Sequence, residues 1–184
     1  MRITGGRLRG RTLKCPAADR IRPTSDRLRE TIFNILAHAY GNPVEGARVL
    51  DVFAGTGAMG IEALSRGASF VLFLEQSAEA CTIIRANILA LGCEAAARVL
   101  KRDARKLGIA PQGEKFSLVF LDPPYGKGLV PPALAALRDG NWLAKDGLLV
   151  MEESAAAAID LPEGIAIAES RRFGATKIVL AAVS

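Results

Sequence analysis

Four consecutive residues, Asp122-Pro123-Pro124-Tyr125, combine an acid, two prolines and an aromatic ring directly after an apolar run. The run, 116–121, has the length and bulk of a buried parallel strand, and the prolines cannot continue it because neither has an N–H to donate. The prolines also fix φ, so the neighbouring carbonyl groups point in set directions. A rigid loop with oxygen acceptors and a stacking ring at a strand's carboxyl end suits a flat, amine-bearing molecule. We favour this interpretation over an ordinary Asp-Pro turn.

A glycine-rich segment earlier in the chain predicts a second binding loop. Gly55, Gly57 and Gly60 have the spacing G-x-G-x-x-G between a predicted strand and a predicted helix, and Glu75 ends the next predicted strand. Glycines at such a turn let a cofactor approach the backbone, and the two oxygens of the acid can hold a ribose diol. By itself the pattern fits a nicotinamide or flavin dinucleotide as well as S-adenosylmethionine.

Asp51, just before the glycine loop, separates these cofactors. A pyrophosphate at a helix N-terminus is disfavoured beside a carboxylate. S-adenosylmethionine carries an ammonium and a sulfonium, both cationic, so it is favoured by the same carboxylate. The alternative role for Asp51 is a carboxylate that caps the turn. The loop therefore predicts an S-adenosylmethionine site.

Positive charge is concentrated at the amino-terminal end of the chain. Of the net charge of +5, residues 1–30 hold nine Lys or Arg against three acids, a net +6, while the remainder holds 15 against 16, a net −1. A basic arm on a near-neutral domain is typical of a phosphate-backbone partner. Ile3, Leu8 and Leu13 alternate with the charges and favour a short folded hairpin over a solubilising tail. We expect an arm over 1–23 and one domain over 24–184.

Alternating helical and strand patterns follow the arm. The first helix is expected from Thr24 or Ser25 to Tyr40, with a hydroxyl cap in front and Gly41 behind. Further helices are expected at 58–66, 78–91 and 130–137, and strands at 48–53, 70–75, 97–101, 116–122, 148–152, 165–171 and 176–182. This alternation implies an α/β fold of three layers, with ligands at the carboxyl ends of parallel strands. The alanine run 155–158 is expected to be a small helix or a surface connection.

Composition excludes several other classes of protein. Half of the residues are hydrophobic and 23% are charged, which is typical of a globular domain, and no apolar stretch is long enough to span a bilayer. Arginines near the start of the chain interrupt any signal-peptide core. Three cysteines without C-x-x-C spacing indicate reduced thiols in the cytoplasm. The single histidine, His38, argues against a metal site and is expected on a helix as a packing or surface residue.

Together these motifs resemble class I, S-adenosylmethionine-dependent methyltransferases, and 122–125 resembles the amino-methyltransferases that act on exocyclic base nitrogens. Residues 2–11 and 22–34 are similar to the bacterial small-subunit ribosomal RNA guanine-N2 methyltransferase family. Segments 50–67 and 122–125 specify only the broad class, and the region after 153 departs from the family. The resemblance implies a Rossmann-like, mostly parallel seven-stranded sheet, and ribosomal RNA or a small ribosomal subunit particle as partner.

The resemblance also assigns roles to single residues. The Asp122 carboxylate and the Pro123 carbonyl would accept the two N–H groups of the target amine, and Tyr125 would stack on a base that has left its helix or loop. Asp103 would contact the adenine amino group, with a helix N-cap as the alternative. The expected catalytic residues are Asp122, Pro123, Pro124 and Tyr125; the expected cofactor contacts are Asp51, Phe53, Ala54, Gly55, Thr56, Gly57, Glu75, Gln76, Asp103 and Ala104; and the expected RNA contacts are Arg7, Arg9, Arg11, Arg22, Thr24 and Arg29.

Other hypotheses remain open from the sequence. Arg22 and Thr24 suit the cofactor as well as RNA. An adenine-N6 methyltransferase acting on RNA or DNA would use the same four residues, and a nicotinamide-dependent oxidoreductase would use the same glycine loop. A non-catalytic RNA-binding assembly factor is disfavoured by the intact cofactor and amine motifs.

Overall fold

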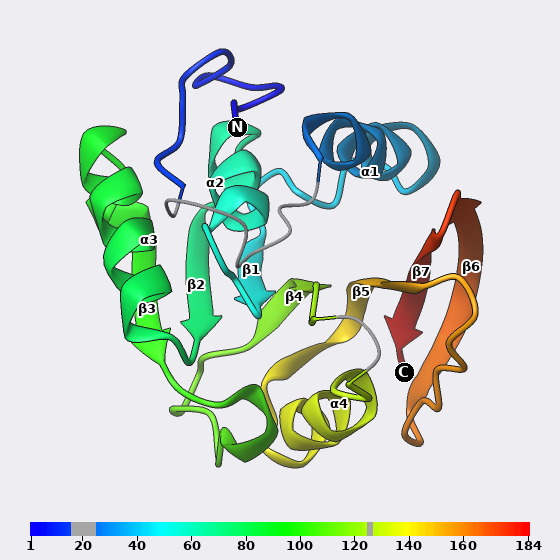
Figure 1. The fold of residues 1–184 in the computed structure, drawn as a ribbon. Helices are drawn as coiled ribbons and strands as arrows, with labels where there is room; N and C mark the ends of the chain where they lie inside the picture. Colours follow the sequence, from blue (N-terminus) through cyan, green and yellow to red (C-terminus); the bar gives the residue numbers. More distant parts are fainter. Residues whose placement is uncertain (16–24, 125–126) are drawn as a thin grey trace.

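A computed structural model describes residues 1–15, 25–124 and 127–184 of the chain. In these parts seven strands form one sheet in the order β3-β2-β1-β4-β5-β7-β6 (Figure 1). The strands are β1 (Arg48–Val52), β2 (Phe70–Glu75), β3 (Ala97–Lys101), β4 (Phe116–Leu121), β5 (Leu143–Ser154), β6 (Ile165–Phe173) and β7 (Thr176–Val183). Neighbours from β3 to β5 are parallel, whereas β7 is antiparallel to both β5 and β6. The expected seven-stranded, mostly parallel sheet is confirmed.

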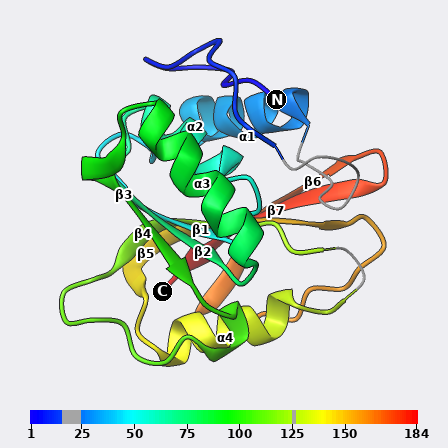
Figure 2. The ribbon, with the colours of Figure 1, turned by 60° about the vertical axis from the view of Figure 1, so that its left-hand side comes forward.

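Helices cover both faces of the sheet. Helices α1 (Asp26–Ala39), α2 (Ala58–Ser65) and α3 (Ala78–Ala90) lie on one face, and α4 (Val130–Asp139) lies on the other (Figures 1 and 2). Two short 3₁₀ helices, η1 (Glu94–Ala96) and η2 (Ala104–Lys106), flank β3. Successive residues of a strand point to opposite faces, so Val49 enters the core under α1–α3 and Leu50 enters the core under α4. The three-layer prediction is confirmed.

Local sequence signals explain where the helices begin and end. The Ser25 side chain accepts a hydrogen bond from the Leu28 N–H at 3.1 Å and so caps α1, and Gly41 follows the helix with φ of 64°. Gly60 in α2 has no room for a side chain, since an added Cβ would lie 2.4 Å from a ring atom of Phe73 on β2. This glycine therefore sets how closely α2 packs on the sheet.

Element boundaries agree with expectation to within two residues, except in β5 (Leu143–Ser154). β5 starts at Leu143, five residues before the expected strand, because Phe116 pairs with Leu143 before an irregularity that leads to the Leu118–Leu148 pair. Asp146 within this stretch has φ of 59°, so strict alternation is lost there and the sequence pattern does not reveal the strand. Residues 155–158 form a surface connection rather than a helix.

Residues 1–15 of the amino-terminal arm are folded, and residues 16–23 of the expected arm lie outside the described residues. Arg2 and Thr12 form an antiparallel bridge, and the Ile3, Leu8 and Leu13 side chains are buried in the same core as α1–α3. The expectation of a short folded hairpin over a loose tail is therefore confirmed.

Three further observations concern expectations from composition. His38 is exposed near the end of α1, and Cys15, Cys81 and Cys93 are free thiols. None of the described helices is long and apolar enough to cross a membrane.

Candidate cofactor and amine site

Three acidic side chains, those of Asp51, Glu75 and Asp122, lie at one edge of the sheet, at the carboxyl ends of the central strands β1, β2 and β4. β1 lies between β2 and β4, and the chain turns outward in opposite directions from it, which makes this edge the topological switch point where α/β sheets bind ligands. Val52 pairs with Leu74 on one side and with Leu121 on the other. Glu75 and Asp122, the residues that follow these partners, therefore flank the end of β1, one residue beyond the level of Val52.

Asp51 is buried below this edge. Its side chain is 2% exposed, and Oδ2 accepts a hydrogen bond from the Gly60 N–H of α2 at 2.9 Å. Burial raises the pKa of Asp51 to about 8; the Gly60 bond opposes this, and the nearby charges of Asp122 and Glu75 add to it. Asp51 therefore also has the alternative role expected from the sequence, because its Oδ2 caps a backbone N–H that follows the glycine turn. A cation bound here would relieve the repulsion among the three acids.

The glycine loop is tightly folded against β2. Phe53, Gly55 and Gly57 have left-handed φ values of 62°, 55° and 77°, and the Ala54 N–H donates to the Leu74 carbonyl at 3.1 Å. Glycine adopts this conformation without strain, whereas Phe53 does so at a cost of about 1–2 kcal/mol. The sequence pattern did not signal the unusual backbone of Phe53. Thr56 is 5% exposed, and its hydroxyl lies 3.6 Å from Met1 Sδ.

Glu75 supports the loop and keeps acceptor capacity. Oε2 accepts from the Gly55 N–H at 3.0 Å and Oε1 accepts from the Ser77 N–H at 2.8 Å. Each carboxylate oxygen has two lone pairs, so both can accept one more hydrogen bond, as a ribose diol would require. Gln76 is exposed beside it.

Asp103 acts as a helix cap in this structure, which is the alternative role that the sequence left open. Its carboxylate accepts from the Arg105 N–H at 2.9 Å and pairs with the Arg105 guanidinium at 2.7 Å. The hydrogen bonds from Arg105 lower the pKa of Asp103 to about 2. Ala104 is buried next to it.

The loop that carries Asp122, Pro123 and Pro124 starts where β4 ends. The Asp122 N–H donates to the Val52 carbonyl at 3.4 Å, which fixes the loop to β1; Asp122 is half-buried, Pro123 is buried and Pro124 is exposed. Tyr125 lies outside the described residues. The loop places the Asp122 carboxylate near enough to Asp51 to influence its protonation.

The expected RNA contacts divide into three groups. Arg7, Arg9 and Arg11 are exposed on the arm, and Arg22 and Thr24 lie outside the described residues. Arg29 has no exposed surface, because its guanidinium pairs with Glu62 at 3.1 Å and with an acid of the same helix at 2.9 Å. A guanidinium closed off in this way cannot reach a phosphate, so the expectation that Arg29 contacts RNA is wrong for this structure.

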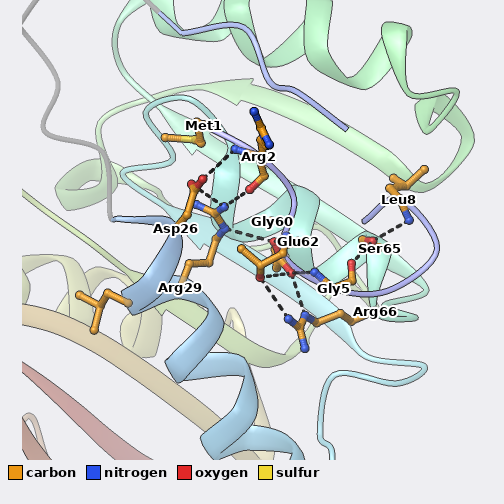
Figure 3. Close-up of polar contacts among 12 residues, drawn as sticks. Met1, Arg2, Gly5, Leu8, Asp26, Arg29, Gly60, Glu62, Ser65 and Arg66 are labelled. Atoms are coloured by element: carbon orange, nitrogen blue, oxygen red, sulfur yellow. Dashed lines mark hydrogen bonds and ion pairs between the residues drawn. The ribbon is translucent and has the colours of Figure 1, made fainter. Parts of the chain in front are cut away.

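Glu62, which the sequence reasoning missed, holds the arm and α1 together (Figure 3). Its carboxylate accepts hydrogen bonds from the Thr4 N–H at 2.8 Å, the Gly5 N–H at 2.7 Å and Arg66 Nε at 2.8 Å, besides the pair with Arg29. The signal available in the sequence was a single charged residue in an otherwise uncharged helix. In the structure every residue of that helix is buried.

Comparison with known proteins identifies the family. A family described as conserved hypothetical protein 95 matches residues 1–182. The chain belongs to this family. Ribosomal RNA small subunit methyltransferase D of Escherichia coli is 39% identical over 152 residues, covering 83% of this chain and 74% of the relative. The protein of that name from Haemophilus influenzae is 34% identical over 176 residues, covering 95% and 89%.

Solved structures agree with this assignment. A protein from Escherichia coli superposes with a TM-score of 0.85 at 31% identity, covering 100% of this chain and 98% of that one. A hypothetical protein from Thermus thermophilus superposes with a TM-score of 0.75 at 32% identity, covering 98% of each chain. The fold is that of class I methyltransferases, and the family is one of S-adenosylmethionine-dependent methyltransferases.

Proposed function

We propose that this protein transfers the methyl group of S-adenosylmethionine to the exocyclic N2 amine of a guanine in small-subunit ribosomal RNA. The observation that carries the proposal is the gathering of Asp51, Glu75 and Asp122 at the switch point, with the pKa of Asp51 raised to about 8 by burial and by the other two acids. The family's relatives named ribosomal RNA small subunit methyltransferase D support the choice of RNA.

The residues around the glycine loop suit this cofactor. Asp51 attracts a cationic group, the spare lone pairs of Glu75 accept the ribose hydroxyls, and Gly55 and Gly57 allow close approach to the backbone. Asp103 is proposed to accept from the adenine amino group. Further contacts are proposed from Phe53, Ala54, Thr56, Gln76 and Ala104. S-adenosylmethionine supplies an electrophilic methyl group on its sulfonium.

The loop after β4 would prepare the amine. An exocyclic base nitrogen is a poor nucleophile because its lone pair is delocalised into the ring. Hydrogen bonds from its two N–H groups to the Asp122 carboxylate and the Pro123 carbonyl let the nitrogen become pyramidal and direct its lone pair outward. The nitrogen would then bond to the methyl carbon in an in-line displacement that breaks the carbon–sulfur bond and leaves S-adenosylhomocysteine. The extra proton of the methylated amine would pass through the Asp122 carboxylate to solvent, and positioning matters more than a strong base. Pro124 keeps the loop rigid, and Tyr125 is proposed to stack on the flipped base.

The arm supplies the electrostatic attraction for RNA. Arg7, Arg9 and Arg11 are exposed, and the arm is fixed to the domain by buried side chains, so its positive charge is held in one place. Arg22 and Thr24 are proposed to contact either the cofactor or the RNA. Replacement of an arm arginine should weaken RNA binding and reduce its salt dependence.

Methyl transfer to ribosomal RNA tests the proposal. The purified protein is incubated with labelled S-adenosylmethionine and small-subunit particles from cells that lack the gene, and the digested nucleosides are separated. We expect label in N2-methylguanosine. Label in N6-methyladenosine would assign the other amine that this loop serves, and absence of label with both particles and protein-free RNA would overturn the proposal.

Calorimetric titration separates the proposal from a dinucleotide-dependent oxidoreductase. We expect binding of S-adenosylmethionine and none of NAD or NADP, because a pyrophosphate would lie beside the acidic side chains of Glu75 and Asp122 and would not stabilise the ionised form of Asp51. Tight dinucleotide binding without S-adenosylmethionine binding would contradict it.

A further inference from the structure

Asn87 on α3 touches two segments that are distant in sequence. Its side chain is 2% exposed, and its amide forms hydrogen bonds to the backbone of Lys14, at the end of the described arm, and of Thr56, in the glycine loop. Oδ1 accepts from the Lys14 N–H at 2.8 Å, and Nδ2 donates to the Lys14 carbonyl at 3.0 Å and to the Thr56 carbonyl at 3.3 Å. One side chain thus joins the arm to the glycine loop.

The helix itself does not explain an asparagine at this position. Asparagine is a weak helix former, and burying an amide is unfavourable unless its groups are hydrogen-bonded. Both N–H groups of Asn87 are used, and all three partners are backbone groups outside α3. The side chain is therefore matched to the arm and the loop rather than to its own helix.

The arm is held at both ends, with its exposed arginines between. Near its start, Thr4 and Gly5 donate to Glu62 on α2, and Figure 3 shows the Gly5 contact; near its end Lys14 is held by Asn87. The first residue also reaches the loop, since Met1 Sδ lies 3.6 Å from Thr56 Oγ1. Asn87 and Met1 thus both connect the arm to the glycine loop, through contacts that are buried or part-buried.

We propose that Asn87 is a positioning residue that couples the arm to the glycine loop, so that RNA and S-adenosylmethionine each bind more tightly when the other is present. The inference rests on the proposed function, in which RNA binds the arm and the cofactor binds the loop. RNA held by the arm restrains Lys14, and the shared amide then restrains the Thr56 carbonyl. Because such coupling is reciprocal, the cofactor strengthens RNA binding by the same factor.

The coupling is measured with S-adenosylhomocysteine, which cannot donate a methyl group. Equilibrium dialysis gives its dissociation constant without and with saturating small-subunit particles from cells that lack the gene. In the natural protein we expect the particles to tighten binding about five-fold or more. In Asn87→Ala, and in the isosteric Asn87→Asp, which lacks both N–H donors, the ratio should fall to about one.

Leu134→Ala is the control for general loss of stability, because Leu134 is buried on α4 in the core of the opposite face, which contains no residue of the arm. Its ratio should remain that of the natural protein, which separates positioning from general loss of stability. A ratio of about one in the natural protein, a retained ratio in both Asn87 variants, or a ratio lost equally in Leu134→Ala would each overturn the coupling. Methylation of the particles, measured in parallel, shows whether the proposed function fails instead.

Discussion

Two buried carboxylates are associated with the short helix α2 but have opposite environments: Glu62 belongs to the helix, and Asp51 on β1 accepts a hydrogen bond from it. The Glu62 carboxylate is surrounded by donors from the arm, α1 and α2, namely Thr4, Gly5, Arg29 and Arg66. Burial alone would raise its pKa, yet these hydrogen bonds outweigh burial and the pKa of Glu62 lies below its usual value. This carboxylate is ionised and stabilises the fold at neutral pH.

Asp51 accepts a hydrogen bond from the Gly60 N–H and has two acidic neighbours. Burial and these neighbours raise its pKa to about 8, so it is mostly protonated at neutral pH until a cation arrives. The difference shows how a protein uses buried charge in two ways. A carboxylate supplied with internal donors builds structure, whereas one left with acidic neighbours favours an external cation.

Removal of Glu62 should produce the largest loss of stability. Glu62→Ala leaves the buried Arg29 guanidinium without its main carboxylate, and a broken buried ion pair typically costs about 3–5 kcal/mol. Urea unfolding measures this, with the exposed Glu163→Ala as control. A loss below about 1 kcal/mol in Glu62→Ala would mean that the arm and α1 are held mainly by apolar contacts.

Removal of Asp122 should produce the largest loss of activity. Asp122→Ala deletes the proposed acceptor for the amine, and loss of such a group typically lowers kcat about 100- to 1,000-fold. Affinity for S-adenosylmethionine should change less than about three-fold, and the exposed Asp139→Ala should behave as the natural protein. Full activity in Asp122→Ala would contradict the amine-orienting role.

Asp51→Asn should change how stability depends on pH. The folded pKa of about 8 exceeds the unfolded value of 3.8, so between these values the native state binds a proton that the unfolded state lacks. The natural protein should therefore lose up to about 1.4 kcal/mol of stability per pH unit relative to Asp51→Asn as the pH rises toward 8. Parallel stability–pH curves for the two proteins would show that Asp51 is ionised in the ligand-free state.

Replacement of the half-buried Asp103 should have the smallest effect. Asp103→Ala removes the cap of η2, which costs about 1 kcal/mol, and removes the proposed adenine contact. We expect S-adenosylmethionine affinity to fall less than about ten-fold in titration calorimetry, with kcat unchanged at saturation. Unchanged affinity would leave Asp103 as a helix cap only.

Local signals were sufficient to predict most of the fold and the centre of the site. The apolar runs gave the limits of β2 and β3 without error, and Ser25 and Gly41 marked the ends of α1. The loop around Gly55 and Gly57 was predictable because its chemistry lies in consecutive residues. In each case the structure depends on neighbours in the sequence.

Contacts between distant segments were not predictable in the same way. Arg29 reads as one more basic residue of the amino-terminal region, and only the fold brings it to Glu62, 33 residues away. Asn87 likewise reads as an ordinary helical polar residue, since Lys14 lies 73 residues before it. Pairing across such separations is set by packing of α1, α2 and α3, which no local pattern records.

The central claim is that Asp51 becomes ionised when the cationic cofactor binds. Titration calorimetry at pH 7 in buffers of different ionisation enthalpy gives the number of protons released with S-adenosylmethionine. With the pKa of Asp51 at about 8, the natural protein should release about 0.9 protons more than Asp51→Asn. Equal proton release by the two proteins would contradict the account.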